Sequence, residues 1–363
     1  RFASKIPLNP IDCGFEVYFK KLESFASPID FATVKDMPGL TEMEFLKNMN
    51  GSLFKITKEE SELLMDIIRT ENPCQKSKEL TPYSKNDFLS EVFMDEETYD
   101  RMRALLEDKK NIILKGAPGV GKTYTAKRLA YSILGNKDKD KIEMVQFHQS
   151  YSYEDFVMGY KPNENGGFDL QRGIFYKFCA KAKSDPDHKY FFIIDEINRG
   201  NLSKIFGELL MLVENSYRDE EITLAYNQEL FSVPKNLYII GMMNTADRSL
   251  AMIDYALRRR FSFVEMKPGF ATDGFRNYQE SLSSDIFDQV IAGIVQLNQV
   301  IANDDSLGDG FCIGHSYFCI QEKFSREWLK NVIEFDIIPM LHEYWFDDKN
   351  KCQQEIDNIK SCL

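Results

Sequence analysis

Short apolar runs alternate with amphipathic segments through the middle of the chain. Five such runs lie at residues 111–114, 142–147, 190–194, 237–243 and 261–264. Runs of this length between helical patterns are typical of a parallel sheet wrapped by helices. Beyond Phe270, apolar residues recur at helical spacing, as at Phe287, Val290, Ile291, Ile294 and Val295. We therefore predict an α/β domain with a five-stranded parallel sheet, followed by a smaller, mainly α-helical lid domain.

Breaks in this pattern divide the chain into three predicted regions. Residues 1–81 carry no motif, and Pro73 with residues 76–79 marks a plausible linker near their end. Residues 82–269 hold the predicted sheet, and residues 270–363 form the lid. Within the α/β domain, the glycine-rich stretch 153–175 interrupts the alternation and indicates an inserted hairpin. The chain begins at Arg1 rather than Met, so we expect a fragment or a processed product.

A glycine-rich segment lies between the first apolar run and a helical pattern that Gly135 stops. Residues 116–123 read G-A-P-G-V-G-K-T and fit the phosphate-binding pattern G-x-x-x-x-G-K-[ST]. Such glycines let backbone N–H groups turn toward a polyphosphate, while Lys122 reaches the outer phosphates and the Thr123 hydroxyl can ligate Mg²⁺. A chance glycine turn is the alternative. The candidate nucleotide-binding residues are Gly116, Pro118, Gly119, Val120, Gly121, Lys122, Thr123 and Tyr124.

Polar side chains follow two other runs. Asp195 and Glu196 come directly after the third run, and Asn244 follows the fourth. Carboxyl ends of parallel strands face the phosphate crevice, so Asp195 can hold Mg²⁺ through water and Glu196 can polarise the attacking water. Asn244 could hold that water or the γ-phosphate. The alternatives are a solvated loop start for the carboxylates and a turn cap for Asn244.

Three consecutive arginines, at residues 258–260, precede the fifth run. They close an amphipathic segment that contains Leu250, Ile253 and Leu257. Cations at a helix C-terminus are favourable on electrostatic grounds alone. The sharper interpretation is that one arginine projects into the phosphate site of a neighbouring subunit and adds positive charge there. The pattern leaves open which of the three does so.

Taken in order, these motifs resemble the McrB-type AAA+ family of P-loop NTPases. The resemblance rests on D-E-I-N-R at 195–199, M-N-T-A-D-R-S at 243–249 and R-R-R-F at 258–261, with further likeness at 144–156 and 313–318. It implies an AAA+ fold with a helix-2 insert and a helical lid. It also implies a ring, usually a hexamer, that hydrolyses GTP with Mg²⁺ within a modification-dependent restriction complex. The expected partner is a McrC-type nuclease subunit.

The resemblance also implies roles for single residues. Lys122 and Thr123 match phosphate and Mg²⁺ ligands, Asp195 a metal residue, Glu196 the water activator and Asn244 the first sensor. Family residues at or beside the subunit interface match Asn198, Asp247, Arg248, Arg258 and Arg259.

The resemblance weakens in the lid and at the N-terminus. His315 or Ser316 replaces the usual lid arginine, although a buried structural histidine is an alternative. Loop residues such as 86–92 would choose between guanine and adenine. Residues 1–81 match no DNA reader.

Composition changes this interpretation in two ways. The net charge of −12 argues against a surface built to neutralise DNA phosphates, so we expect DNA contact through another domain or subunit. Seven scattered cysteines indicate reduced thiols, and no apolar run reaches the ~20 residues of a membrane helix. We therefore expect a soluble, cytoplasmic protein without membrane contact.

Two alternative functions remain open at this point. One is an ATP-driven protein-remodelling AAA+ enzyme of the MoxR type, which shares the helix-2 insert. The other is a nucleotide-gated assembly scaffold with little turnover, which Glu196 and Asn244 disfavour because both would serve hydrolysis.

Overall fold

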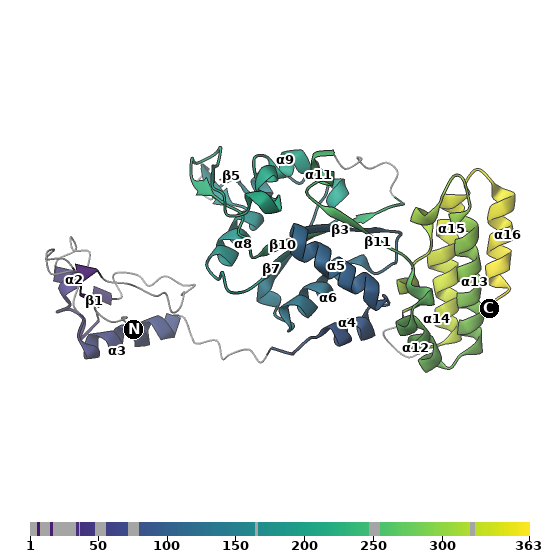
Figure 1. Cartoon of the computed structure of the whole chain (residues 1–363), viewed down its shortest axis with the longest axis horizontal. Helices are drawn as coiled ribbons and strands as arrows, with labels where there is room; N and C mark the ends of the chain where they lie inside the picture. The colour runs from purple at the N-terminus through teal and green to yellow at the C-terminus, as the bar shows by residue number, and fades with distance from the viewer. Residues whose placement is uncertain are drawn as a thin grey trace. The chain divides into compact units, whose positions relative to one another are not determined.

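The computed structural model describes residues 80–363 except 164–165, 247–254 and 320–323, and, nearer the N-terminus, residues 6–7, 15–16, 34–35, 37–47 and 56–71. The chain divides by its contacts into one unit at Arg1–Glu79 and another at Leu80–Leu363 (Figure 1). Among its described residues, the first unit has an antiparallel strand pair, β1 (Ile6–Pro7) with β2 (Phe15–Glu16), and the helices α2 (Glu44–Lys47) and α3 (Lys58–Glu71). The predicted linker at Pro73 and 76–79 lies outside the described residues.

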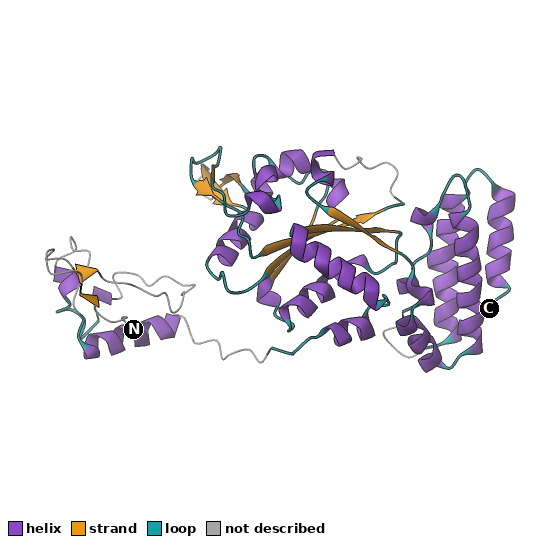
Figure 2. Ribbon diagram, viewed as in Figure 1, coloured by secondary structure: helices purple, strands orange, loops and turns teal. Residues whose placement is uncertain are grey.

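A five-stranded parallel sheet forms the centre of the second unit (Figure 2), as predicted. Its strands in spatial order are β11 (Ser262–Met266), β3 (Asn111–Gly116), β10 (Leu237–Asn244), β7 (Tyr190–Asp195) and β4 (Ile142–Gln146). β10 pairs with β3 such that Asn244 lies opposite Gly116. The C-terminal ends of β3, β10 and β7 therefore meet at one edge of the sheet.

Alternate residues of each strand face opposite sides of the sheet, and each side is buried. Ile112 and Leu114 belong to one hydrophobic core, whereas Ile113 between them belongs to the other. The first side is covered by α4 (Lys85–Glu91), α5 (Glu96–Lys109) and α6 (Lys122–Leu134). The second side is covered by α8 (Ile174–Lys183), α9 (Leu202–Phe206) and α10 (Leu209–Leu212).

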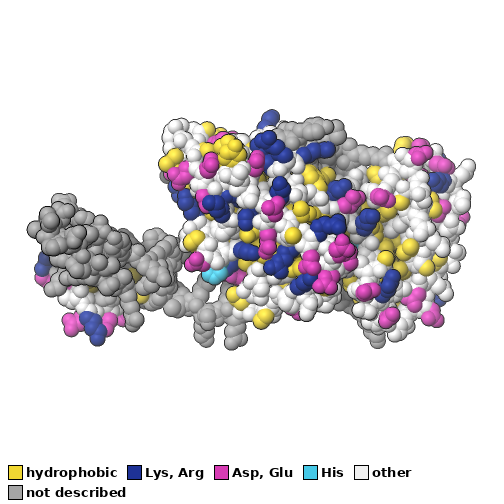
Figure 3. Space-filling view, in the orientation of Figure 1, with side chains coloured by type: hydrophobic (Ala, Val, Ile, Leu, Met, Phe, Trp, Pro, Cys, Tyr) yellow, Lys and Arg dark blue, Asp and Glu magenta, His cyan; other side chains and the backbone are white. Residues whose placement is uncertain are grey.

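The predicted insertion is a hairpin that contacts a second, shorter hairpin. α7 (Tyr153–Phe156) leads into β5 (Met158–Pro162) and β6 (Phe168–Arg172), while β8 (Ile222–Thr223) pairs with β9 (Leu230–Phe231). Arg172 joins the two hairpins by donating to both carboxylate oxygens of Glu229, each at 3.1 Å. Apolar side chains gather on the surface over β5 (Figure 3), where Tyr160 and Phe168 are exposed.

The lid is helical, as predicted. Its helices are α12 (Asp273–Leu282), α13 (Asp285–Ala302), α14 (Arg326–Asn331), α15 (Ile338–Tyr344) and α16 (Lys349–Lys360), and a π-helical turn at Val332–Ile337 joins α14 to α15. The apolar face of α13 packs into the same core as Ile112 and Leu114. The lid therefore shares its hydrophobic core with one side of the sheet. In the part of the chain that is described, no helix has the length and apolar character needed to span a bilayer.

One local prediction is wrong. Residues 86–92, expected to form a loop, belong largely to helix α4. Ser84 caps this helix, because its hydroxyl accepts from the Asp87 N–H while the Asp87 carboxylate accepts from the Ser84 N–H at 2.7 Å. This reciprocal capping box stabilises a helix start, and Phe88 is buried in the core.

Candidate functional site

The glycine-rich segment connects the end of β3 to the start of α6. Lys122 lies at the first position of the helix, and its Nζ donates to the carbonyl oxygens of Gly116 and Ala117, both at 2.9 Å. No side chain caps the N-terminus of α6. The first N–H groups of this helix and the Lys122 ammonium therefore form a positive end that can receive an anion.

Three polar side chains lie beside this loop at the ends of two adjacent strands. β7 ends at Asp195, and the Glu196 N–H donates to the Asp195 Oδ1 at 3.0 Å. The Asn244 Nδ2, at the end of β10, donates to the Glu196 Oε1 at 2.6 Å. Because β10 lies between β3 and β7, the sheet order itself brings Asn244 between the loop and the carboxylates.

Glu196 is held on both carboxylate oxygens. Its Oε2 accepts from the Arg199 Nε at 3.2 Å, so Arg199 and Asn244 fix the carboxylate from opposite ends. Glu196 also adopts left-handed backbone angles, with φ of 50° and ψ of 45°, which few residues other than glycine or asparagine take. Such strain often occurs at functional positions. Arg199 was not among the predicted site residues, although its i+3 spacing from Glu196 could have indicated this contact.

These groups line one cavity of about 350 Å³. The residues that line it are Gly119, Gly121, Lys122, Thr123, Tyr124, Asp195, Glu196, Met243, Asn244 and Ser316. The structure thus brings together much of the predicted phosphate-binding loop, both predicted Mg²⁺ residues, and Glu196 and Asn244 from the predicted catalytic residues. Gly116, Pro118 and Val120 shape the loop without lining the cavity, and Val120 is buried beneath it.

Tyr124 extends the cavity toward a charged cluster. The guanidinium carbon of Arg128, one turn later in α6, lies 3.0 Å from the centre of the Tyr124 ring. Arg128 in turn donates from its Nε to Glu91 at 2.6 Å, and Lys137 donates to the other oxygen of Glu91 at 3.3 Å. The aromatic face of Tyr124 is therefore held in place beside the loop. The i, i+4 spacing of Tyr124 and Arg128 could have suggested this pair.

The two lid candidates occupy different environments. Ser316 lines the cavity, whereas His315 is buried and does not. The His315 Nδ1 accepts from the Gly269 N–H at 2.8 Å, and burial lowers the pKa of His315 to about 4. His315 is therefore a neutral side chain in the lid core at ordinary pH.

The other predicted residues that the structure describes do not line the cavity. Asn198 is buried in a 3-10 turn at Ile197–Arg199. Arg258 ends helix α11 (Tyr255–Arg258), and both Arg258 and Arg259 are exposed. Arg259 lies 3.8 Å from the Glu214 carboxylate. Asp247 and Arg248, with Leu250 and Ile253, lie outside the described residues.

The oxygen donors at the loop fit Mg²⁺. The Thr123 hydroxyl and the Asp195 carboxylate line the same cavity, and Mg²⁺ typically takes one or two such ligands together with substrate phosphates and water. Among the described residues, no group of three or more His, Cys, Asp or Glu side chains forms a metal cage. The donor set therefore suits an ion that arrives with a polyphosphate.

Two protein families match the chain. The AAA domain of the dynein-related subfamily matches residues 111–261, which include strands β3, β4, β7 and β10 and, apart from Ser316, the residues that line the cavity. The α-helical lid domain of McrB matches residues 289–353. Both matches agree with the observed sheet and lid.

Two of the curated relatives are components of restriction enzymes. The chain is 50% identical over 284 residues to the type IV methyl-directed restriction enzyme EcoKMcrB subunit of Escherichia coli, which covers 75% of this chain and 62% of that protein. It is 28% identical over 217 residues to the type II restriction enzyme BsuMI component YdiS of Bacillus subtilis, covering 49% of this chain and 63% of that protein. The chain thus spans less than two thirds of the length of these relatives.

Proposed function

Because this chain belongs to the McrB-like AAA proteins, we propose that it is the nucleotide-hydrolysing motor of a complex that restricts modified DNA. The observation that carries the proposal is the cavity in which Lys122 and Thr123 meet Asp195, Glu196 and Asn244. A phosphate-binding loop beside an acidic strand end and a polar amide has the parts that hydrolysis of a nucleoside triphosphate requires.

Each side chain in the cavity has a separate role in the proposed hydrolysis, which follows from its position. Lys122 exchanges the carbonyls of Gly116 and Ala117 for phosphate oxygens, which offer it a full negative charge. Glu196 accepts a proton from the attacking water, and Asn244 positions both that water and Glu196. Thr123 and Asp195 would hold Mg²⁺, which neutralises charge on the phosphates. Tyr124 borders the cavity on its exposed side.

We propose that GTP is preferred to ATP, on the likeness to the McrB-type family. Displacement of mant-GTP by unlabelled GTP and ATP, in the presence of Mg²⁺, tests the preference, and phosphate release from each nucleotide tests turnover. GTP should displace the probe at lower concentration and be hydrolysed. Tighter binding and faster hydrolysis of ATP would instead favour the protein-remodelling alternative.

We also propose that the chain assembles into a ring, with six subunits as in the resembling family. Arg258 and Arg259 are exposed on the far side of the sheet from the lid core, where they could reach the cavity of a neighbouring subunit. A site completed by the neighbour links nucleotide occupancy to assembly. Native mass measurement at saturating GTP should show the ring, and a monomer under those conditions contradicts this proposal.

A McrC-type nuclease subunit is the proposed partner, and DNA contact is assigned to another domain or subunit. The net charge of −12 supports this division, because a DNA-binding surface needs clustered cations. Methylated plasmid incubated with the chain, GTP and Mg²⁺ should stay intact until the partner is added, and the partner should raise phosphate release. Cleavage by the chain alone contradicts the division.

A further inference from the structure

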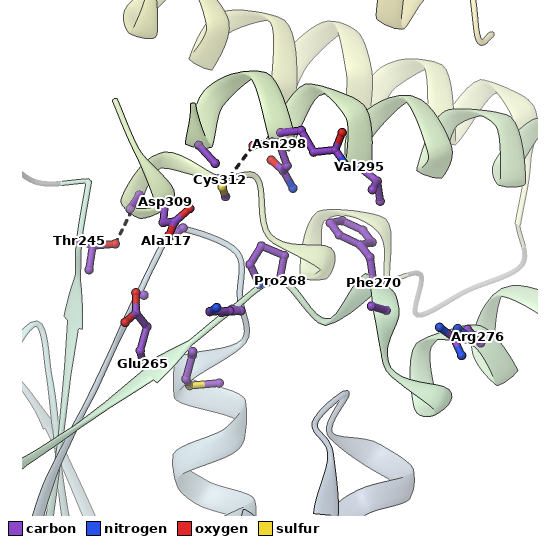
Figure 4. A pocket seen from close by; sticks show the side chains of 17 residues that line it. Ala117, Thr245, Glu265, Pro268, Phe270, Arg276, Val295, Asn298, Asp309 and Cys312 are labelled. Carbon is purple, nitrogen blue, oxygen red and sulfur yellow. Dashed lines mark hydrogen bonds between the residues drawn. The ribbon is translucent and has the colours of Figure 1, made fainter. Parts of the chain in front are cut away.

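Strand β3 has different neighbours at its two ends. Where it ends, the start of the phosphate-binding loop borders a second cavity of about 440 Å³ between sheet and lid (Figure 4). Where it begins, Asn111 is polar and fully buried. The Asn111 Nδ2 donates to the carbonyl oxygens of Val213 at 2.8 Å and of Arg260 at 3.1 Å. The beginning of β3 is therefore hydrogen-bonded to the backbone of the arginine segment, residues 258–260.

A buried cation fixes the orientation of the Asn111 amide. The Arg218 Nη2 donates to the Asn111 Oδ1 at 2.7 Å, so the Nδ2 of the same amide must face the carbonyls. Arg218 is 2% exposed, and its Nε donates to the Val213 carbonyl at 3.0 Å. Burial lowers the pKa of Arg218 to about 10, so the guanidinium stays charged at neutral pH. Apolar side chains at these two positions would avoid the cost of burying a charge, so packing alone does not explain the pair.

Glu214 contacts the side chains of the arginine segment. Its Oε2 lies 3.8 Å from the Arg259 Nη2 and 3.8 Å from the Arg260 Nε. Among the described residues, none donates a hydrogen bond to this buried oxygen. The Arg260 side chain is 11% exposed, whereas that of Arg259 is 72% exposed. Arg260 therefore anchors the segment, and Arg259 projects from it in an ion pair that a phosphate group can displace.

We propose that Asn111, Arg218 and Glu214 are positioning residues for the arginine that acts on the phosphates of a neighbouring subunit. The inference rests on the proposed ring and its nucleotide function. Asn111 and Arg218 fix the backbone of Arg260. Glu214 holds the Arg259 guanidinium until a phosphate of the neighbour replaces the carboxylate. These contacts should therefore affect turnover without affecting nucleotide binding in the same subunit.

Asn111→Asp tests the backbone contact. The new carboxylate can still accept from Arg218, but it cannot donate to the Arg260 carbonyl. Phosphate release at saturating GTP should fall by up to about a hundredfold, the cost of displacing a catalytic group by about 1 Å. Affinity for mant-GTP should stay within about twofold, because the subunit's own phosphate contacts remain. Asn215→Asp is the matched control, since the exposed Asn215 amide donates instead to the Asp108 carbonyl at 2.7 Å.

Mixing variants separates a positioning role from a general loss of structure. Asn111→Asp subunits keep their phosphate-binding loop, and Lys122→Ala subunits supply intact arginines. Phosphate release by this mixture should therefore exceed the mean of the two separate proteins. A mixture of Asn111→Asp with Arg259→Ala should stay at the mean, because both variants lack the same half of the shared site. A misfolded subunit would gain activity in neither mixture.

Glu214→Gln tests the side-chain contact and leaves strand β3 untouched. It removes the ion pair at nearly constant shape, so turnover should fall about two- to fivefold at unchanged mant-GTP affinity. Glu220→Gln, exposed nearby, is its control. Wild-type turnover in both Asn111→Asp and Glu214→Gln overturns the inference while the proposed function stands, as does an Asn111→Asp protein that binds mant-GTP but gains in no mixture. If the wild type neither binds mant-GTP nor releases phosphate, the proposed function fails and the inference with it.

Discussion

The two sides of the sheet are equally buried but lead to different parts of the molecule. On one side, Ile112 and Leu114 share a core with α5, α6 and lid residues such as Ile294. On the other, Ile113 and Phe192 share a core with α8, α9 and Leu257, which directly precedes the arginines. The phosphate-binding loop and the lid are thus one packed body, whereas the opposite side carries the hairpins and Arg258–Arg260. The comparison teaches that bound nucleotide has a packed route to the lid within one chain, whereas the arginines on the opposite side are the residues that we propose act on a neighbouring chain.

The largest effect is expected from a change at Glu196, which lies at the edge of the sheet where its two sides meet. Glu196→Gln keeps the shape and the contact with Asn244 but cannot accept a proton. Phosphate release from GTP should fall by about 10²–10⁴-fold, the usual contribution of a general base. Affinity for mant-GTP should stay within about twofold, because the phosphate contacts remain. Glu220→Gln, exposed on the surface, is the control, and normal turnover by Glu196→Gln removes the proposed role.

Lys122→Ala should weaken the binding of the triphosphate without affecting the rest of the fold. The triphosphate loses its main cation, and two charge-assisted hydrogen bonds correspond to an affinity loss of about a thousandfold. Titration with mant-GTP measures the loss, and Lys127→Ala on the same helix controls for a change of net charge. The unfolding temperature should change little, because the hydrogen bonds from the Lys122 Nζ to the Gly116 and Ala117 carbonyls stay within one loop. If Lys122→Ala kept the wild-type affinity for mant-GTP, the nucleotide would have to bind at a site other than this loop.

A smaller effect is expected on the free energy of unfolding when a change of pH protonates His315 in the lid. Burial lowers the pKa of His315 from 6.5 to about 4, so the folded state favours the neutral ring. The stabilisation is fully present above pH 6.5 and is lost as pH falls toward 4. Between pH 7.5 and 5.5 the free energy of unfolding should drop by about 1 kcal/mol from this group.

Denaturant unfolding at both pH values measures this change. His315→Asn offers a matched variant, because its amide oxygen can accept from the Gly269 N–H without titrating in this range. The pH-dependent difference between wild type and His315→Asn should be about 1 kcal/mol. Identical pH dependence of the two proteins would contradict the neutral, buried state of His315.

The parts of the fold that the sequence predicts are those set by local pattern. All five strands, the phosphate-binding loop and the stop of α6 at Gly135, which has φ of 78°, follow from apolar runs and glycine chemistry. Contacts between the lid and the phosphate-binding loop could not be predicted from local sequence pattern. Nothing in the spacing of Gly314 and Gly119 indicates that their backbones touch, because the approach depends on how the lid packs on the sheet. Residues 86–92 were wrongly predicted to form a loop for a local reason, because the capping box of Ser84 and Asp87 that starts helix α4 was not recognised in the sequence.

The measurement that tests the account most directly mixes two inactive variants. Lys122→Ala lacks the phosphate cation and Arg259→Ala lacks the proposed arginine of the opposite side, so each alone should release little phosphate. If the arginine of one subunit completes the loop of its neighbour, some interfaces in a mixed ring contain both intact halves. Phosphate release from GTP by the one-to-one mixture should then clearly exceed the mean of the two separate proteins. A mixture no more active than that mean would contradict the division between the two sides of the sheet.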